Sequence, residues 1–165
     1  MDITAFVAAR RPELVRAAVL MGARQSDAED LVQITLMKCH KNWHKVSAAA
    51  EPLAYVYGIL INSLRTAKSR RSGSEIPVDD LELIDADAIS MSMDDLHAGL
   101  AVRAALHAQS RQHREVIVLR YYVDLSEQQT ADVLGIPSGT VKSRTARALA
   151  ALANDPHISQ EIRHA

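Results

Sequence analysis

Residues 126–152 read SEQQTADVLGIPSGTVKSRTARALAAL, and this stretch predicts two short helices joined by a tight turn. Ser126 and Gln129 have the S-x-x-Q spacing of a capping box, in which two side chains satisfy backbone N–H groups at a helix start. Gly135 can adopt the left-handed conformation that ends the first helix. Ser138 can then cap the second. The pattern is typical of a helix-turn-helix.

The second of these helices has two chemically different faces. Its apolar face would pack inward and contains Val141, Thr145, Ala148, Leu149 and Leu152. Its outward face carries the hydroxyls and cations of Thr140, Ser143, Arg144 and Arg147, with Lys142 at the edge. Such groups on a second helix suit the major groove of duplex DNA. A plain helical hairpin is the alternative.

Residues 52–71 (PLAYVYGILINSLRTAKSRR) predict a longer helix, with Pro52 suited to its first turn. One arc is apolar and contains Leu53, Val56, Tyr57, Leu60, Ile61 and Leu64. The opposite side contains Tyr55, Asn62, Arg65, Thr66 and Ser69, and leads into Lys68, Arg70 and Arg71. Rings stack on unpaired bases while cations hold phosphates, so this side suits single-stranded nucleic acid. A solvated helix face with a basic end explains the same residues.

A third helix is predicted to begin at Ser26, where Ser26 and Glu29 have the S-x-x-E spacing of a capping box. One buried stripe would contain Ala28, Leu31, Val32, Thr35, Leu36, Cys39 and Trp43. Glu29, Asp30 and Gln33 point away from that stripe. Acids in a first helical turn complement the helix dipole, which explains them without any partner.

The charge of the chain is unevenly distributed, although its net value is only -1. Residues 1–72 carry a net +5, residues 73–96 a net -8, residues 97–153 a net +3 and residues 154–165 a net -1. Two basic blocks around an acidic one indicate two modules that meet a polyanion. Ordinary variation in surface charge is the alternative.

The composition excludes several classes of protein. The 165 residues, 48% of them hydrophobic, contain no apolar run near the roughly 20 residues of a membrane span, and the amino end lacks a signal-peptide core. The single cysteine cannot form an internal disulfide, so we expect a cytoplasmic protein. No GxGxxG or P-loop string, and no nucleophile constellation, points to an enzyme or a cofactor.

A metal site is weakly suggested by His40 and His44, which lie four residues apart beside Cys39. The string HKNWH lacks the glutamate of HExxH, and the helical phase turns Cys39 inward. We therefore expect no metal.

The acidic stretch GSEIPVDDLELIDADAISMSMDDL at 73–96 follows no sustained period and is predicted to be a flexible linker, in which a short helix around 86–93 could form. Its 24 residues reach roughly 80 Å at about 3.3–3.6 Å per residue. The segments on either side read as helical. The fold expected is all-α: two small helical domains joined by this acidic linker.

With these segments in hand, the chain resembles the extracytoplasmic-function sigma factors of the sigma-70 family, and the actinobacterial type most closely. The resemblance covers FVAARRPELVRAAVLMG near the amino end, DAEDLVQ at 27–33, the tryptophan at 43, PLAYVYGILIN at 52–62 and REVIVLRYYVDLSEQQTADVLGIPSGTVKSRTARAL at 114–149. Each string is weak alone, but their order around the linker is specific.

The resemblance implies sigma domain 2 at residues 1–72, a linker at 73–96, a helix-turn-helix sigma domain 4 at 97–153 and a disordered tail at 154–165. Core RNA polymerase is the implied partner, through the clamp helices of its largest subunit and its flap. The docking residues by this match are Asp27, Glu29, Asp30 and Gln33. Promoter DNA is a second partner and an anti-sigma factor a third candidate, and no membrane is implied.

The same resemblance assigns the DNA contacts. Those expected at the melted minus-10 element are Trp43, Tyr55, Asn62, Arg65, Thr66, Ser69 and Arg70, with the loop from Trp43 to Pro52 receiving a flipped base. Those expected at the minus-35 element are Ser138, Thr140, Lys142, Ser143, Arg144 and Arg147. The promoter elements implied by the resemblance lie under two duplex turns apart, which is roughly 60 Å at about 34–36 Å per turn. The linker is long enough to span that distance. The acidity of the linker is explained equally well by a path through polymerase channels that hold nucleic acid and by an inert, solvated tether.

Two features depart from the family. The first basic helix ends SLRTAKSRR without the usual tryptophans, and AQSRQHRE lacks the usual proline. A stand-alone helix-turn-helix regulator explains residues 114–152 as well but leaves DAEDLVQ and the Tyr55–Ser69 face unexplained. A protein-binding helical adaptor explains only the acids.

Overall fold

The computed structural model describes residues 2–71 and 93–159 of the chain. Within these ranges the secondary structure is helical, without strands, which confirms the all-α prediction. The helices are α1 (Ile3–Leu20), α2 (Gln25–Lys41), α3 (Trp43–Ala48), α4 (Pro52–Arg71), α5 (Met93–Ala108), α6 (Arg111–Ile117), the π-helical turn η2 (Val118–Tyr122), α7 (Glu127–Leu134) and α8 (Ser138–Ala153).

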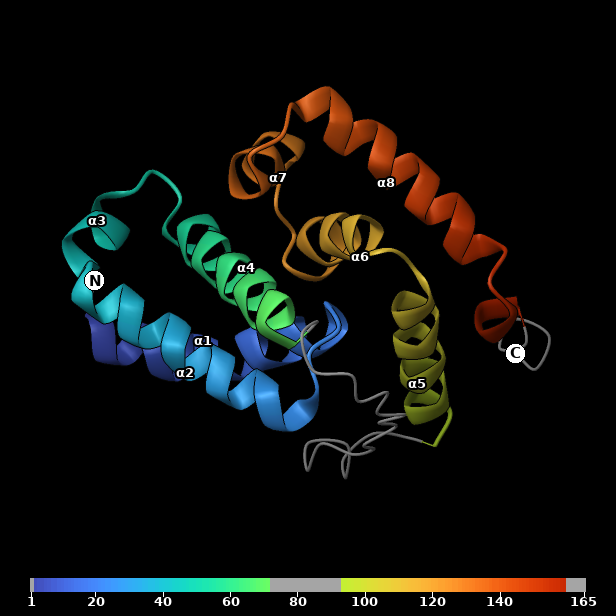
Figure 1. The fold of residues 1–165 in the computed structure, drawn as a ribbon, viewed down its shortest axis with the longest axis horizontal. Coiled ribbons are helices and arrows are strands. Elements are labelled where there is room, and N and C mark those ends of the chain that lie inside the picture. Colours follow the sequence, from blue (N-terminus) through green and yellow to red (C-terminus); the bar gives the residue numbers. More distant parts are fainter. Residues whose placement is uncertain (1, 72–92, 160–165) are drawn as a thin grey trace.

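The first half of the chain is built on α1, α2 and α4, which pack side by side (Figure 1). Most of the apolar residues predicted for α2 and α4 are buried between them, with Val32, Val56 and Leu60 fully inaccessible. Leu53 and Leu64 are half-buried, and Trp43 lies beyond the end of α2. Burial of such stripes is the main source of stability for short helices, which are marginal on their own.

The second half contains α5 to α8, and α8 packs across α6 and α7 (Figure 1). Ser126 and Gln129 form the predicted capping box at the start of α7, at 3.1 Å and 2.8 Å. Gly135 takes the predicted left-handed conformation at its end, with φ +65°. The helix-turn-helix prediction is therefore confirmed.

The two halves pack directly against each other. Helix α7 lies against α4, while α1 contacts both α5 and η2. A single apolar cluster runs through both halves, from Leu14 and Tyr57 on one side to Leu119 and Leu134 on the other. The α4 face predicted for nucleic acid thus lies close to the second half of the chain.

Two predicted helix starts are wrong. Helix α2 begins at Gln25, one residue before Ser26, and has no side-chain cap; Glu29 bonds Arg11 instead, at 3.0 Å. Helix α8 follows Pro137, and Ser138 makes no capping bond. Helix α2 packs against α1 and α4, and α8 packs against α6 and α7. Neither helix has a side-chain cap, so we attribute the positions of their first residues to this packing.

Four further expectations differ from the structure. The loop expected from Trp43 to Pro52 is helical over most of its length, as α3. Leu149, expected inside, is 41% exposed. The tail is folded where described, because residues 156–159 are helical and Asp155 is buried. Helix α5 starts at Met93, inside the predicted linker, whereas the helix expected around 86–93 lies almost wholly outside the described residues.

Candidate nucleic-acid interface

Helix α8 presents its predicted polar face to solvent. Ser138, Lys142, Ser143 and Arg147 are exposed, and Thr140 and Arg144 are half-buried. Val141, Thr145 and Ala148 on the opposite face are buried, and Thr145 donates to the carbonyl of Val141 at 2.7 Å. The buried face fixes the orientation of the helix and therefore of its three cations.

The cations of α8 are available to a ligand. Among the described residues, Lys142, Arg144 and Arg147 form no ion pair. Unpaired guanidinium groups can make bidentate bonds to phosphates or to guanine edges. The Ser143 hydroxyl donates to the Thr140 carbonyl of its own helix at 3.1 Å, which leaves its oxygen able to accept.

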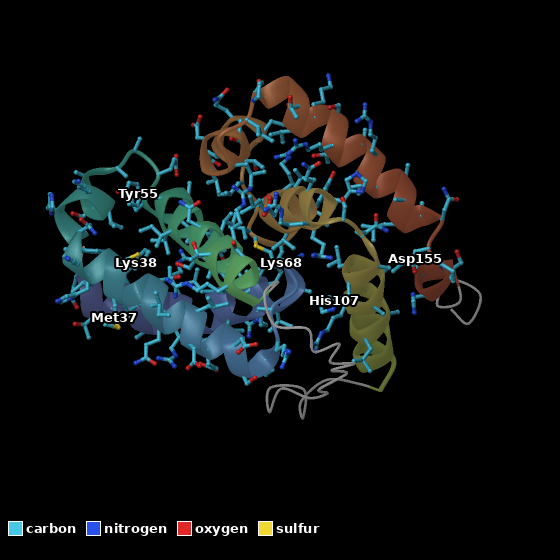
Figure 2. All side chains as sticks on the ribbon, in the orientation of Figure 1. Met37, Lys38, Tyr55, Lys68, His107 and Asp155 are labelled. Atoms are coloured by element: carbon cyan, nitrogen blue, oxygen red, sulfur yellow. The ribbon has the colours of Figure 1, made fainter. Side chains whose placement is uncertain are left out.

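Helix α4 carries the second predicted set. Tyr55, Asn62, Thr66, Ser69 and Arg70 are exposed, opposite a face that buries Val56, Tyr57, Leu60 and Ile61. The amino-terminal part of the exposed face borders a groove of about 480 Å³, which α7 closes from the other side with Gln129, Asp132 and Val133. Tyr55 lies near the start of α4 at this groove (Figure 2).

Arg65 differs from the other members of this set because it is already occupied. Its Nε and Nη2 atoms donate to the two carboxylate oxygens of Glu115 on α6, at 3.2 Å and 2.9 Å. The Glu115 side chain is only 6% exposed. Glu115 was not predicted from the sequence, although a lone acid at the start of the apolar run EVIVL is a signal that could have identified it.

Trp43, the remaining member of the minus-10 set, does not lie with the others. It begins α3, is half-buried and packs its ring against Phe6, with centroids 5.6 Å apart. Part of its stacking surface is therefore covered by the protein.

The acidic face of α2 forms a third surface. Glu29, Asp30 and Gln33 are exposed, while Asp27 is half-buried with Arg24 at 3.9 Å. Ile34 and Met37 are also exposed on this helix, at 45% and 65%, which the sequence did not predict. Figure 2 shows Met37 on α2. Large exposed apolar side chains beside polar ones are typical of a protein-protein contact.

A cavity of about 290 Å³ lies where α2, α4 and α6 meet. Asp27, Asp30 and Ile34 line it from α2, and Arg111 and Arg114 line it from α6. Two of the acids predicted to dock on polymerase, Asp27 and Asp30, therefore share a cavity with arginines of the second half of the chain.

The suggested metal site is not assembled. Cys39 is buried, and burial raises the pKa of its thiol to about 11, while His40 and His44 are exposed. A thiolate is the form that binds metal, so this thiol is a poor ligand. No cluster of three metal-binding side chains occurs in the described ranges. None of the helices described there has both the length and the apolar character that a bilayer crossing requires.

Comparison with known proteins matches two families to two separate parts of the chain. Residues 6–74 match the family Sigma-70 region 2, and residues 100–152 match Sigma-70, region 4. The RNA polymerase sigma-E factor of Streptomyces avermitilis is 30% identical over 153 residues, which cover 92% of this chain and 83% of that protein.

The ECF RNA polymerase sigma factor SigL of Mycobacterium tuberculosis is 32% identical over 145 residues, covering 84% of this chain and 80% of that one. Among solved structures, the sigma factor RpoE from Bartonella quintana, crystallised with the anti-sigma factor NepR, aligns with a TM-score of 0.75 at 27% identity, over 92% and 94% of the two chains. A stand-alone regulator is not favoured by these relatives. The chain belongs to the extracytoplasmic-function sigma factors of the sigma-70 family, which direct RNA polymerase to initiate transcription.

Proposed function

We propose that this sigma factor divides promoter recognition between two domains, residues 1–72 and 97–153. In the first, the exposed face of α2 docks on the clamp helices of core RNA polymerase through Asp27, Glu29, Asp30 and Gln33, and the exposed face of α4 holds the melted minus-10 strand. In the second domain, α8 enters the major groove of the minus-35 element. The same domain contacts the polymerase flap.

The observation that carries this proposal is the placement of three chemically distinct residue sets on three helices. Each set lies mainly on the solvent side of a helix whose other side is buried. The acids with adjacent apolar side chains suit a protein partner, the aromatic and amide groups suit unpaired bases, and the unpaired cations suit duplex DNA.

The chemistry of the two DNA surfaces differs in a way that matches closed and open duplex. Helix α8 carries cations and hydroxyls without an aromatic ring, which suits base edges and phosphates in a groove. Helix α4 carries Tyr55 and Asn62 at its first and middle turns and Arg70 at its end. A ring can stack only on a base that has left its own stack, so we assign α4 to the melted strand.

Trp43 is the weakest member of the proposed minus-10 set because its ring already packs against Phe6. We propose that Trp43 stabilises the position of α3 through its packing against Phe6. Residues 49–51, which connect α3 to α4, receive the flipped base. Ala49, Ala50 and Glu51 border the groove that also contains Tyr55.

Two further assignments follow from the family. We propose that an anti-sigma factor controls this chain, because the similar protein from Bartonella quintana was crystallised in complex with the anti-sigma factor NepR. We also propose that the chain acts in the cytoplasm, where polymerase and promoter are found, and that it catalyses no reaction by itself.

The test is promoter-specific initiation in a purified system. The chain is mixed with core polymerase and a genomic library, and transcript starts are mapped by sequencing. We expect starts that depend on the chain and share two upstream elements at fixed spacing. Transcripts identical with and without the chain would overturn the proposal.

A further inference from the structure

The cavity where α2, α4 and α6 meet has the size and lining of a site for a small molecule. Its volume is about 290 Å³, and its apolar lining includes Leu31, Ile34 and Leu64. Ligand sites are concave and mostly apolar, with a few polar groups that orient the ligand, and they start at roughly 300 Å³. The cavity therefore suits one small molecule and is too small for a peptide or a nucleic-acid strand.

Part of the charge in the cavity lining is already compensated by the protein. Four cations and three acids line the cavity within the described part of the chain. Arg65 and Arg111 share the carboxylate of Glu115, at 2.9 Å and 3.8 Å. Asp27 lies 3.9 Å from Arg24, which is outside the lining. Two cations and one acid of the lining remain once these contacts are counted.

Arg114 is the more buried of the two remaining cations. It is half-buried and forms no ion pair within residues 2–71 and 93–159. Its Nη1 atom donates to the backbone carbonyls of Gln109 and His107, at 2.7 Å and 3.3 Å, which positions the guanidinium without supplying a negative charge. Burial lowers the pKa of this guanidinium, because water solvates the cation less well there. An anion beside Arg114 would supply the missing countercharge.

Lys68 is the second remaining cation. It is exposed near the end of α4 (Figure 2) and forms no ion pair with any other described residue. The remaining acid, Asp30, is exposed on α2 and is therefore solvated. Positive charge beside an apolar wall matches a ligand that has an anionic group on an apolar body.

We propose that this cavity is a regulatory site for a small organic anion. The apolar body of the ligand, a ring or a short acyl chain, lies against Leu31 and Ile34, and its anionic group lies near Lys68 and Arg114. Asp30 and Ile34 also belong to the α2 surface proposed to dock on polymerase, so an occupied cavity hinders docking. This regulatory effect rests on the proposed function of α2.

The first measurement is a fluorescence titration of the full chain with anilinonaphthalene sulfonate, which joins aromatic rings to one sulfonate group. Phenylnaphthylamine has the same rings without the sulfonate, and inorganic sulfate has an anionic group without the rings. We expect one molecule of the ring sulfonate to bind per chain. We also expect it to bind roughly tenfold more tightly than either of the other two compounds, because only the ring sulfonate uses both parts of the lining.

Two variants place the binding in the cavity. Lys68→Gln removes a cation, and Ala67→Leu adds volume at a neighbouring lining position of α4. Lys45→Gln is the matched control, because it removes the same charge from an exposed position of α3 outside the lining. We expect both cavity variants to weaken binding of the ring sulfonate by roughly fivefold, and the control to leave it unchanged. Only Ala67→Leu should also weaken binding of phenylnaphthylamine.

The second measurement is the affinity of the chain for core polymerase, with and without enough ring sulfonate to saturate the wild-type chain. We expect the sulfonate to weaken the affinity of the wild type and of Lys45→Gln by roughly fivefold, and that of Lys68→Gln by less. An equal effect on all three chains would place the action of the sulfonate on polymerase and would overturn the regulatory site.

Absence of saturable binding, or equal binding by the wild type and both cavity variants, would overturn the site. Since Lys68 is exposed, Lys68→Gln keeps this test valid if Ala67→Leu does not fold. Binding in the cavity without any effect on polymerase affinity would overturn its regulatory role, and the proposed function would stand in each of these cases. If the chain without any probe fails to bind core polymerase, the proposed function and the regulatory role fail together, while the titration still decides whether the cavity binds the anion.

Discussion

Side chains of the same chemical type take different roles in this chain according to their depth. Glu29 and Asp30 are exposed on α2, whereas Glu115 is buried and paired. Arg147 is exposed on α8 and forms no ion pair within residues 2–71 and 93–159, whereas Nε and Nη2 of Arg65 both donate to Glu115. Sequence periodicity separates buried from exposed positions but does not identify the partner of a buried charge.

The thiol of Cys39 should be unreactive in the native chain. Burial raises its pKa from 9.0 to about 11, and the side chain is almost inaccessible. At pH 8.5 a shift of this size leaves roughly a hundredfold less thiolate than a free cysteine has. We expect reaction with a chromogenic disulfide to be slow in buffer and fast in denaturant, and equally fast rates would contradict the buried position.

The same shift has a consequence for stability. The pKa of Cys39 is higher in the folded chain than in the unfolded chain. The free energy of unfolding that this difference contributes is therefore fully present below pH 9.0 and is lost as the pH rises toward about 11. Urea unfolding of the wild type and of Cys39→Ala between pH 8 and 10.5 measures this. The wild type should lose more stability than the variant across that range; parallel curves would contradict the shift.

Asp30 offers the most direct test of the docking surface. It is exposed on α2, so Asp30→Lys should leave the melting temperature nearly unchanged while weakening binding to core polymerase at least tenfold, which is about 1.4 kcal/mol. Asp132→Lys on α7 makes the same charge change at another exposed acid and serves as the control. Equal affinities of the two variants for polymerase would contradict the assignment of α2.

At the scale of single helices, local signals predict ends well only where the chain turns sharply. The capping box at Ser126 and the left-handed Gly135 are both present, because a tight turn between α7 and α8 requires them. The similar signal at Ser26 fails, since α2 begins at Gln25 and is positioned by packing against α1 and α4. Leu149 is 41% exposed, whereas Thr145 and Ala148 on the same helix are buried.

Gly135→Ala tests the turn. The position has φ +65° and open space around an added Cβ, so the cost is backbone strain alone, roughly 1–2 kcal/mol. Gly58→Ala is the control: it lies inside α4 with open space, and alanine there should stabilise by roughly 0.5–1 kcal/mol. Urea unfolding measures both, and shifts of the same sign would contradict the conformation of Gly135.

Arg144 tests the recognition helix. If it reads a base, Arg144→Ala should cost about 1–3 kcal/mol in promoter binding and relax specificity at one minus-35 position. The measurement is the affinity of the polymerase holoenzyme for a set of single-base promoter variants, with Arg147→Ala measured alongside. A uniform loss across all variants would make Arg144 a phosphate contact, and no loss would remove it from the interface.

At the scale of the whole molecule, the sequence predicted the helices and their exposed faces but not how the two halves meet. Periodicity and capping are local, so they identify the buried stripe of α4 and the faces of α8. The contact between α4 and α7 and the Arg65–Glu115 pair join residues fifty or more positions apart, and no local pattern specifies them. The minus-10 residues of α4 were predicted to share one solvent-facing side, whereas Arg65 is half-buried and paired with Glu115 of α6.

We propose that this chain recognises a promoter as a subunit of polymerase and not alone. Its most direct test is the affinity of the purified chain for a labelled duplex promoter, measured with and without core polymerase at fixed salt. We expect weak, sequence-independent binding by the chain alone and tight, promoter-specific binding once core polymerase is added. Tight, specific binding by the free chain that core polymerase does not improve would contradict it.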